Sequence, residues 1–277
     1  MSERRFDVWT AGDAYERYMG RWSRLVADEF VRWLACPPEA RWLDVGCGSG
    51  ALTSTVAVRC RPRALLGVER SAGFAATARA SAPPPTCVAV ADAQALPVGD
   101  AVFDVAVSGL VLNFLPAPGV ALAEAVRGVR PGGVVAAYVW DYAEGMGFLR
   151  HFWAAATTVD PSADAHDEGR RFPLCRPSAL RTLWSEAGLT EVTVAPIEIP
   201  TLFAHFDDLW TPFLSGQGPA PGHVAALSPD RREDLRRTLR ARVPTRADGT
   251  IPLTARAWAV RGRKATTSSR GAGRTQR

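Results

Sequence analysis

The sequence predicts an α/β protein built on a doubly wound, mostly parallel sheet of seven strands that carries helical cap insertions. Five short apolar runs between residues 42 and 140 alternate with segments of helical spacing, which is the pattern of successive strand and helix units. A glycine-rich turn directly follows the first run. Two further alternating runs near the C-terminus supply the remaining strands. Because right-handed crossovers leave few other topologies, we expect one open sheet with helices on both faces.

The expected elements follow from the spacing of apolar residues along the chain. Aromatic and aliphatic residues recur at three- and four-residue steps over residues 13–35, which predicts an N-terminal helix. Further helices are predicted at residues 51–58, 71–80, 120–129, 177–187 and 230–243, with Ser71 as an N-cap and Gly188 as a C-cap. The strands are predicted at residues 42–45, 64–70, 86–91, 101–110, 134–140, 191–203 and 251–260.

The chain is expected to form a single domain over residues 1–263. Residues 1–38 would supply a cap helix, and two aromatic-rich insertions at 141–176 and 204–245 would complete the cap. Residues 264–277 are rich in Ser, Gly, Thr and Arg, which predicts a disordered basic tail. Six basic residues and no acid lie between residues 261 and 277, so they alone exceed the net charge of +5. The sequence pI of about 9.2 therefore does not indicate a nucleic-acid surface on the folded domain.

Cysteine usage and hydropathy indicate a cytoplasmic protein without metal. The five cysteines are scattered, odd in number and lack the paired spacing of zinc ligands, which favours a reduced compartment and no metal site. The N-terminus has no apolar signal segment, and no 18-residue apolar stretch occurs, so we expect no membrane insertion. The sequence specifies no oligomeric state.

The glycine-rich turn predicts a small-ligand site. Residues 41–50 are a short apolar strand that enters three alternating glycines, Gly46, Gly48 and Gly50. Glycine lets the backbone approach a ligand closely or adopt positive φ, and the helix behind the turn presents unpaired N–H groups. The spacing also satisfies a dinucleotide-binding pattern, with Glu69 at about the ~20-residue offset of a ribose-binding acid. A nicotinamide-dependent oxidoreductase is therefore one interpretation.

A resemblance favours a different cofactor. Leu43-Asp-Val-Gly-Cys-Gly-Ser-Gly50 resembles the first motif of class I S-adenosylmethionine (SAM) dependent methyltransferases, whose acidic position is filled by Asp44. Three further segments follow in that family's order: the acid-tipped second strand, Asp92-Ala-Gln-Ala-Leu-Pro97 and Arg130-Pro-Gly-Gly133. The N-terminal 140 residues thus look like a small-molecule methyltransferase of the kind found in ubiquinone and menaquinone biosynthesis. The resemblance implies the Rossmann-like methyltransferase fold, with SAM as cofactor and an antiparallel edge hairpin.

The resemblance also implies which residues bind SAM. Glu69 would accept hydrogen bonds from the ribose hydroxyls, Asp92 would accept from the adenine amino group, and Arg21 would face the methionine carboxylate. The competing interpretations are a surface acid, a turn cap and a packing helix with a solvated arginine. The full set of expected cofactor-binding residues is Tyr18, Arg21, Asp44, Gly46, Cys47, Gly48, Gly50, Glu69, Arg70, Asp92, Ala93, Ser108, Gly109 and Leu110.

The acceptor and the catalytic groups are less specified by the sequence. Methyl transfer needs an aligned acceptor lone pair, and it needs a base only for acceptors such as hydroxyls. The candidate bases are His151, Asp141, His205 and Tyr18, although a lone histidine in an aromatic segment is more often a packing residue. Aromatics in residues 140–153 and 203–213 predict a capped pocket for a small apolar molecule, or else an ordinary core. The rival functions are an RNA methyltransferase that uses the basic tail and a non-catalytic SAM-binding protein.

Overall fold

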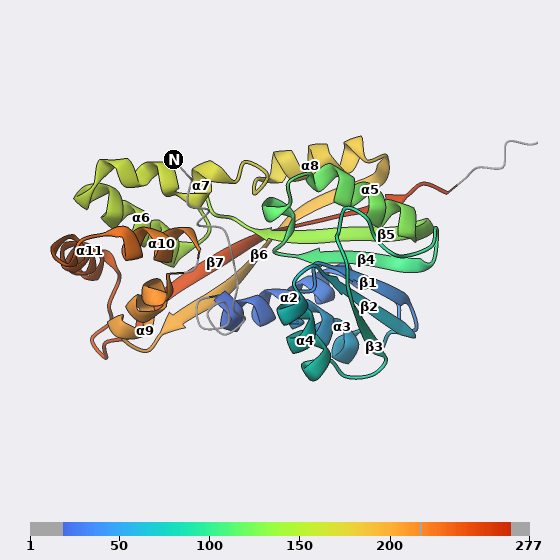
Figure 1. Ribbon diagram of the computed structural model, residues 1–277, viewed down its shortest axis with the longest axis horizontal. Helices are drawn as coiled ribbons and strands as arrows, with labels where there is room; N and C mark the ends of the chain where they lie inside the picture. The colour runs from blue at the N-terminus through green and yellow to red at the C-terminus, as the bar shows by residue number, and fades with distance from the viewer. Residues whose placement is uncertain (1–18, 217, 267–277) are drawn as a thin grey trace, which may run out of the picture.

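A computed structural model describes residues 19–216 and 218–266 as a seven-stranded mixed sheet between two helical layers (Figure 1). The strand order is β3-β2-β1-β4-β5-β7-β6, and β7 runs antiparallel to both of its neighbours. The predicted fold class is therefore confirmed. The strands are β1 (Arg41–Val45), β2 (Ala64–Glu69), β3 (Thr86–Val90), β4 (Phe103–Gly109), β5 (Val129–Trp140), β6 (Leu189–Phe203) and β7 (Ile251–Lys264).

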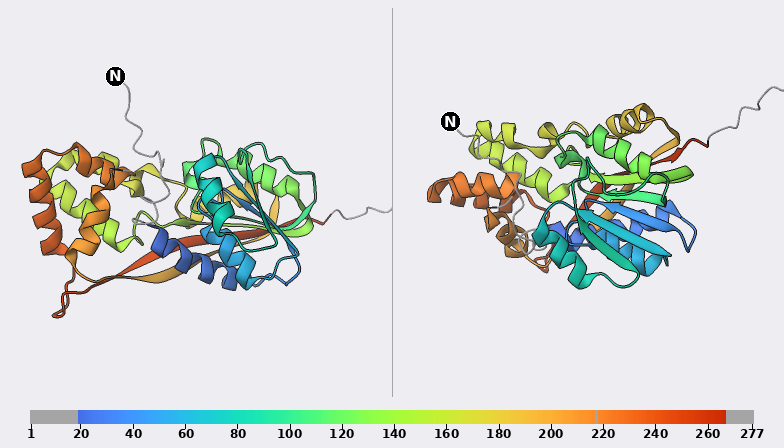
Figure 2. Two further views of the ribbon diagram at one scale, coloured as in Figure 1. Left: turned by 60° about the horizontal axis from the view of Figure 1, so that its bottom comes forward. Right: turned by 45° about the vertical axis from the view of Figure 1, so that its right-hand side comes forward.

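Helices cover both faces of the parallel strands. α2 (Arg21–Leu34), α3 (Ala51–Arg59) and α4 (Ala72–Ser81) lie on one face, while α5 (Pro118–Gly128) and α8 (Pro177–Glu186) lie on the other (Figures 1 and 2). Both predicted caps are present. The Ser71 hydroxyl accepts a hydrogen bond from Phe74 N at 3.4 Å, and Gly188 adopts φ +74 two residues beyond the end of α8. Within the described ranges, no helix is long and apolar enough to cross a membrane.

The fifth strand begins earlier than the sequence predicts. β5 starts at Val129 instead of residue 134, and Arg130-Pro-Gly-Gly133 forms an irregularity inside the strand. Phe103 pairs with Val129 and Val105 with Val134, so four residues of β5 bulge between the two pairs. The predicted start at residue 134 was too late, because Val129 already pairs with Phe103 before the bulge.

Two long strands carry the cap away from the sheet. β6 and β7 pair along their whole length, from Leu189 opposite Lys264 to Phe203 opposite Ile251. β5 accompanies β7 only as far as the pair Trp140 and Ala257, so residues 251–256 extend past the carboxyl end of β5. The insertions after β5 and β6 pack there (Figures 1 and 2). They comprise α6 (Gly147–Val159), η3 (Pro161–His166), α7 (Glu168–Arg171), α9 (Phe206–Trp210), η4 (Thr211–Ser215), α10 (Pro219–Ala226) and α11 (Pro229–Arg242).

The cap has an aromatic core of its own. Phe152 stacks on Phe213 with ring centroids 4.4 Å apart, and Phe152 meets Trp153 edge-on at 5.0 Å. Trp153 Nε1 donates a hydrogen bond to the carboxylate of Glu168, which is buried. Burial raises the pKa of Glu168 to about 7. The insertion aromatics therefore stabilise the cap by packing on one another.

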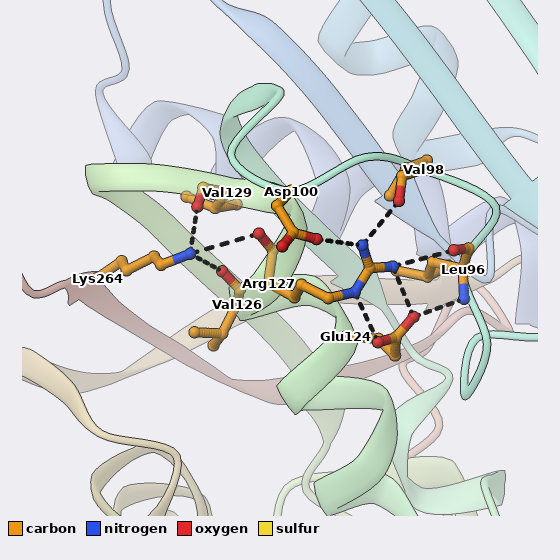
Figure 3. Close-up of polar contacts among 8 residues, drawn as sticks. All are labelled: Leu96, Val98, Asp100, Glu124, Val126, Arg127, Val129 and Lys264. Carbon is orange, nitrogen blue, oxygen red and sulfur yellow. Dashed lines mark hydrogen bonds and ion pairs between the residues drawn. The ribbon is translucent and has the colours of Figure 1, made fainter.

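The C-terminal end of β7 is anchored by the protein's single lysine (Figure 3). The Lys264 ammonium donates to the carbonyl oxygens of Val126, Arg127 and Val129 at 2.7, 3.3 and 2.8 Å. A cation at the last carbonyls of a helix is favourable, because those groups have no intrahelical donor. The predicted tail began at residue 264, but the structure places Lys264 in β7, and residues 267–277 lie outside the described residues.

Arg127, on the last turn of α5, holds the loop before β4 in place. Arg127 donates to the carbonyls of Leu96 and Val98, and it forms ion pairs with Asp100 and Glu124 (Figure 3). Glu124 also accepts from Leu96 N at 2.9 Å. The C-terminal turn of α5 is thereby tied to residues 96–100 on one side and to β7 on the other.

A matched pair of truncations tests the anchor. A chain that ends at Arg263 should unfold more easily than one that ends at Lys264, by about 1–3 kcal/mol, because three carbonyls lose a charged donor. Urea unfolding of both truncations and of Lys264→Met measures the difference. Equal midpoints for the three proteins would show that the lysine contacts contribute nothing.

Candidate functional site

A cavity of about 560 Å³ opens at the carboxyl ends of the parallel strands. Open α/β sheets bind ligands at this edge, and the volume lies within the range of small-molecule sites. The lining comes from α2, from the first turns of α3 and α4, from the carboxyl-terminal parts of β1, β2, β4 and β5, and from the loops that follow these strands. It consists of Ser23, Asp44, Gly46, Cys47, Gly48, Ser49, Ala51, Leu52, Glu69, Arg70, Ser71, Phe74, Gly109, Leu110, Val111, Phe114, Leu115, Pro116 and Tyr138.

A second hollow, of about 490 Å³, lies at the opposite edge of the sheet. Its arginines already have partners, since Arg130 pairs with Asp104 and Arg263 pairs with Glu191. It is also remote from the glycine-rich turn. We therefore place the site in the first cavity.

The turn after β1 is shaped by positive backbone angles. Gly46 has φ +75, and a Cβ there would lie 2.7 Å from a methyl carbon of Val111. Gly48 has φ +55 and nothing within 4 Å of the position that a Cβ would occupy, so its backbone faces open space. Gly46 N and Cys47 N both donate to Val68 O, at 2.8 and 3.0 Å. The turn is thus fastened to β2 and leaves its backbone open to a ligand.

Glu69 joins the glycine-rich turn to the next helix. One carboxylate oxygen accepts from Gly48 N at 3.0 Å, and the other accepts from Ser71 N at 2.8 Å. Each oxygen keeps a second lone pair, so a diol can still be bound. The residue lies at the tip of β2, where the sequence predicts it, and it lines the cavity.

Asp44 presents a buried carboxylate to the cavity. Its Oδ2 accepts from the Thr53 hydroxyl at 2.6 Å, and its Oδ1 has no hydrogen-bond partner among the described residues. The residue is fully buried, and this burial raises its pKa to about 7. An acceptor oxygen of this kind needs a donor, preferably a cationic one. The ammonium group of the methionine part of SAM fits that requirement.

The expected cofactor residues fall into two groups by position. Those that line the cavity are Asp44, Gly46, Cys47, Gly48, Glu69, Arg70, Gly109 and Leu110. Those that do not line it are Arg21, Gly50, Asp92, Ala93 and Ser108, and Tyr18 lies outside the described residues.

The residues outside the lining have other partners. Arg21 donates to Asp208 Oδ1 at 2.9 Å and lies over the ring of Trp22. Asp92 Oδ1 accepts from Gln94 N at 2.9 Å, which is the turn-capping contact that competed with an adenine contact. The Ser108 hydroxyl donates to Val45 O at 2.8 Å and joins β4 to β1.

The three described candidates for a catalytic base lie away from the cavity. Asp141 is buried and forms an ion pair with Arg256 at 2.6 Å. His151 lies on α6 in the cap, where burial first and Arg242 second lower its pKa. His205 caps α9, with Nδ1 accepting from Asp208 N at 3.2 Å. Tyr18, the fourth candidate, lies outside the described residues.

The cavity also contains residues that sequence reasoning missed. Phe74 extends from α4, four lining residues between Val111 and Pro116 follow β4, and Tyr138 lies two residues before the end of β5. Leu110 adopts φ +62, a costly angle for a branched residue, which turns the chain at the cavity wall. The only sequence signal for Tyr138 was a tyrosine near the end of the fifth strand. Its pairing with Gly109 on the fourth strand became visible only in the structure.

Comparisons with known proteins identify the family. A model described as "Methyltransferase domain" matches residues 43–137. The chain is 26% identical over 238 residues to 2-methyl-6-phytyl-1,4-hydroquinone methyltransferase of Synechocystis sp., covering 77% of this chain and 73% of that protein. It is 40% identical over 99 residues to malonyl-[acyl-carrier protein] O-methyltransferase of Geobacter sulfurreducens, covering 35% of this chain and only 37% of that relative.

A solved structure shows the same fold. Phosphoethanolamine N-methyltransferase 2 of Haemonchus contortus, in complex with phosphomonomethylethanolamine and S-adenosylhomocysteine, aligns with a TM-score of 0.56 and 15% identity. The alignment covers 92% of this chain and 57% of that one. The chain belongs to the class I SAM-dependent methyltransferases and uses SAM as its methyl donor.

Cofactor affinity should depend on Glu69. Glu69→Ala should weaken binding of S-adenosylhomocysteine by about 1–3 kcal/mol, because the ribose hydroxyls and two backbone N–H groups lose a charged acceptor. Asp92→Ala should cost less, since Asp92 does not line the cavity. Titration calorimetry on both variants measures the difference, with thermal midpoints as the folding control. An unchanged affinity of Glu69→Ala for S-adenosylhomocysteine would refute the assignment of Glu69 to the ribose hydroxyls.

The stability of the protein without cofactor should fall as pH rises from about 5 to 7.5. The pKa of Asp44 and that of Glu168 are about 7, above the ordinary values of 3.8 and 4.5. In this window the native state therefore binds more protons than the unfolded state, and each group's stabilisation is lost as pH rises.

Two conservative variants separate the contributions of these carboxyls. Asp44→Asn and Glu168→Gln should each flatten the profile by an amount on the order of 2 kcal/mol, measured by urea unfolding at several pH values. A wild-type profile that rises across the window would contradict the protonated, buried state of these carboxyls.

Proposed function

We propose that this SAM-dependent methyltransferase methylates an oxygen, nitrogen or carbon atom of a small, apolar or aromatic acceptor. The observation that carries the proposal is the wall of the cavity beyond the glycine-rich turn. It is built from Leu110, Val111, Phe114, Leu115 and Pro116, all apolar. Burial of apolar surface against such a wall selects apolar ligands at about 25 cal/mol per Å².

The cofactor would lie across the ends of β1 and β2. Glu69 would hold the ribose hydroxyls, the backbone of Gly46 to Gly48 would lie against the methionine part, and Asp44 would accept from its ammonium group. SAM supplies an electrophilic methyl group on a sulfonium. The remaining half of the cavity, over β4 and β5, is then the space from which an acceptor approaches.

In this proposal the residues of the chain act mainly by aligning the acceptor with the methyl group of SAM. Fixing two reactants in a productive geometry contributes up to ~7–11 kcal/mol in favourable systems. No histidine, and no carboxylate other than Asp44 and Glu69, lines the cavity among the described residues. An acceptor that reacts as an enolate, a phenolate or a free amine needs no strong base, so this lining suits such acceptors. The Synechocystis relative is named a hydroquinone methyltransferase, which supports the same class of acceptor.

We also propose that the chain forms one catalytic domain, with the helices between β5 and α8 and between β6 and β7 as its cap. The cap lies beyond the carboxyl ends of the parallel strands (Figure 1). Phe172, which follows α7, meets Phe114 edge-on with centroids 5.2 Å apart. The cap thereby contacts the acceptor wall through this aromatic pair, and it would limit the access of water from that side.

A tritiated-SAM assay tests the proposed function. Extracts fractionated into small apolar molecules, acyl-carrier proteins and RNA would be supplied in parallel as acceptors. Radioactivity should enter the small-molecule fraction. Transfer to carrier protein alone, or to RNA with activity that falls steeply with salt, would refute the proposal.

The acceptor wall and the cap core should respond differently to mutation. Phe114→Ala should raise acceptor KM about tenfold and leave S-adenosylhomocysteine affinity within threefold, because Phe114 lines the cavity and is 36% exposed. Trp153→Ala should lower stability by about 3–5 kcal/mol, because Trp153 is buried in the cap. Kinetics and thermal unfolding of both variants provide the measurement. A change in acceptor selectivity in a folded Trp153→Ala protein would contradict this assignment, because it would show that the insertion aromatics line the acceptor pocket.

A further inference from the structure

The acceptor wall includes one aromatic ring at the end of a very short helix. This helix, η2 (Leu112–Phe114), directly follows β4 and closes with a local hydrogen bond from Phe114 N to Val111 O at 2.9 Å. Leu112 at its start is buried, whereas Phe114 at its end lines the cavity and is 36% exposed. Between them, the buried Nδ2 of Asn113 has no hydrogen-bond partner among the described residues. The Phe114 ring therefore needs contacts from outside η2 to keep a fixed position.

Phe172 supplies such a contact from the cap. Its ring meets that of Phe114 with centroids 5.2 Å apart and an interplanar angle of 76°, an edge-on geometry that aromatic pairs prefer. The Phe172 ring also lies 5.5 Å from the ring of Tyr142, which is buried in the turn after β5. Phe172 thereby joins the turn after β5 to the chain after β4.

The helix α7 fixes the backbone of Phe172. Phe172 N donates to Glu168 O at 2.9 Å, and so closes the last turn of the helix. At the other end of α7, Asp167 Oδ2 accepts from Arg150 Nη1 on α6 at 2.8 Å. A Cβ on Gly169 would lie 2.9 Å from a backbone oxygen of the turn after β5, so α7 packs closely on that turn. The ring that contacts the acceptor wall is thus carried on a firmly held segment.

The position of Phe114 along the sheet assigns the aromatic pair to the acceptor. Glu69, which would hold the ribose of the cofactor, lies on β2, and the sheet order places β4 two strands away. No residue of the described part of the cap lines the cavity. A change at Phe172 should therefore reach the acceptor through Phe114 and leave the cofactor in place. This step rests on the proposed function, which assigns the chain after β4 to the acceptor.

We propose that Phe172 is a positioning residue for the acceptor, because it holds the Phe114 ring against the end of the cavity that an apolar acceptor occupies. A half-exposed side chain that becomes ordered only when a ligand binds lowers the affinity for that ligand. A ring that is fixed in advance avoids this cost. The cap then contributes to acceptor affinity without lining the cavity itself.

A double-mutant cycle on Phe172 and Phe114 tests the proposal without turnover. The probe is 4-butylphenol, an aromatic ring with an apolar chain, titrated by calorimetry into protein saturated with S-adenosylhomocysteine. Phe172→Ala should weaken probe binding about fivefold in the wild-type background, which corresponds to about 1 kcal/mol. In the Phe114→Ala background the same change should weaken binding less than twofold, because the ring that Phe172 positions is then absent.

A second phenylalanine of the cap controls for general loosening of that region. Phe206 is buried, stacks on Trp210 with centroids 6.4 Å apart and does not line the cavity. Phe206→Ala should leave the probe affinity within twofold, even though it lowers stability. An equal loss of affinity in Phe206→Ala and Phe172→Ala would overturn the proposal. A fivefold loss from Phe172→Ala in both backgrounds, or a loss below twofold in the wild-type background, would overturn it too.

A milder variant keeps the test decisive if Phe172→Ala does not fold. Phe172→Leu fills part of the space but lacks the ring edge, so it should weaken probe binding about threefold, again only where Phe114 is present. The same loss in both backgrounds, or no loss in either, would overturn the proposal.

The affinity for S-adenosylhomocysteine separates this inference from other outcomes. It should stay within threefold in every variant, and a larger loss in Phe172→Ala would assign the aromatic pair to the cofactor and overturn the inference. Failure of 4-butylphenol to bind the wild type would overturn it as well. Failure of the proposed function appears elsewhere, as the absence of methyl transfer to any small molecule by the wild-type protein.

Discussion

The ion pair between Arg256 and Asp141 fixes the cap to the sheet. Arg256 Nε donates to Asp141 Oδ2 at 2.7 Å, and backbone hydrogen bonds run from Asp141 N to Arg256 O and from Arg256 N to Gly145 O. A Cβ on Gly145 would lie 2.5 Å from Arg256 Cβ, so the turn between β5 and the cap requires glycine. Loss of one partner would leave a buried charge uncompensated, which costs ~3–5 kcal/mol in comparable cases. The same contact explains why Asp141, a candidate base by sequence, serves as an anchor.

Different strands supply the polar and the apolar parts of the cavity. The turn after β1 and the tip of β2 supply backbone and carboxylate groups, which suit the polar parts of SAM. The chain after β4 supplies apolar side chains, and β5 supplies one tyrosine hydroxyl. Positive φ at Gly46, Gly48 and Leu110 turns the backbone aside at the boundaries between these parts. Glycine adopts positive φ without strain, so Leu110 is the strained residue of the three. Strain at such a position is typical of sites where geometry matters more than local stability.

The parallel half of the fold could be predicted because its signals are local. An apolar run, a glycine turn and a helix start each depend on neighbouring residues, and β1 to β4 lie within three residues of their expected bounds. Side-chain partners could not be predicted, since they depend on residues distant in sequence. Arg21 meets Asp208 and Lys264 meets the end of α5, at separations of 187 and about 135 residues. The same distance effect hid Tyr138, which lines the cavity beside Gly109 of the adjacent strand.

The insertion aromatics illustrate why composition alone does not locate a pocket. A cap of short helices buries little surface unless large side chains fill its centre, so Phe152, Trp153 and Phe213 are needed for folding. Once they pack on one another, they are no longer available to a ligand. Under the proposed function, acceptor recognition would fall instead to residues 110–116, which directly follow β4. Because the ladder of β4 fixes where this segment begins, its side chains would be held more precisely than those of the outer cap loops.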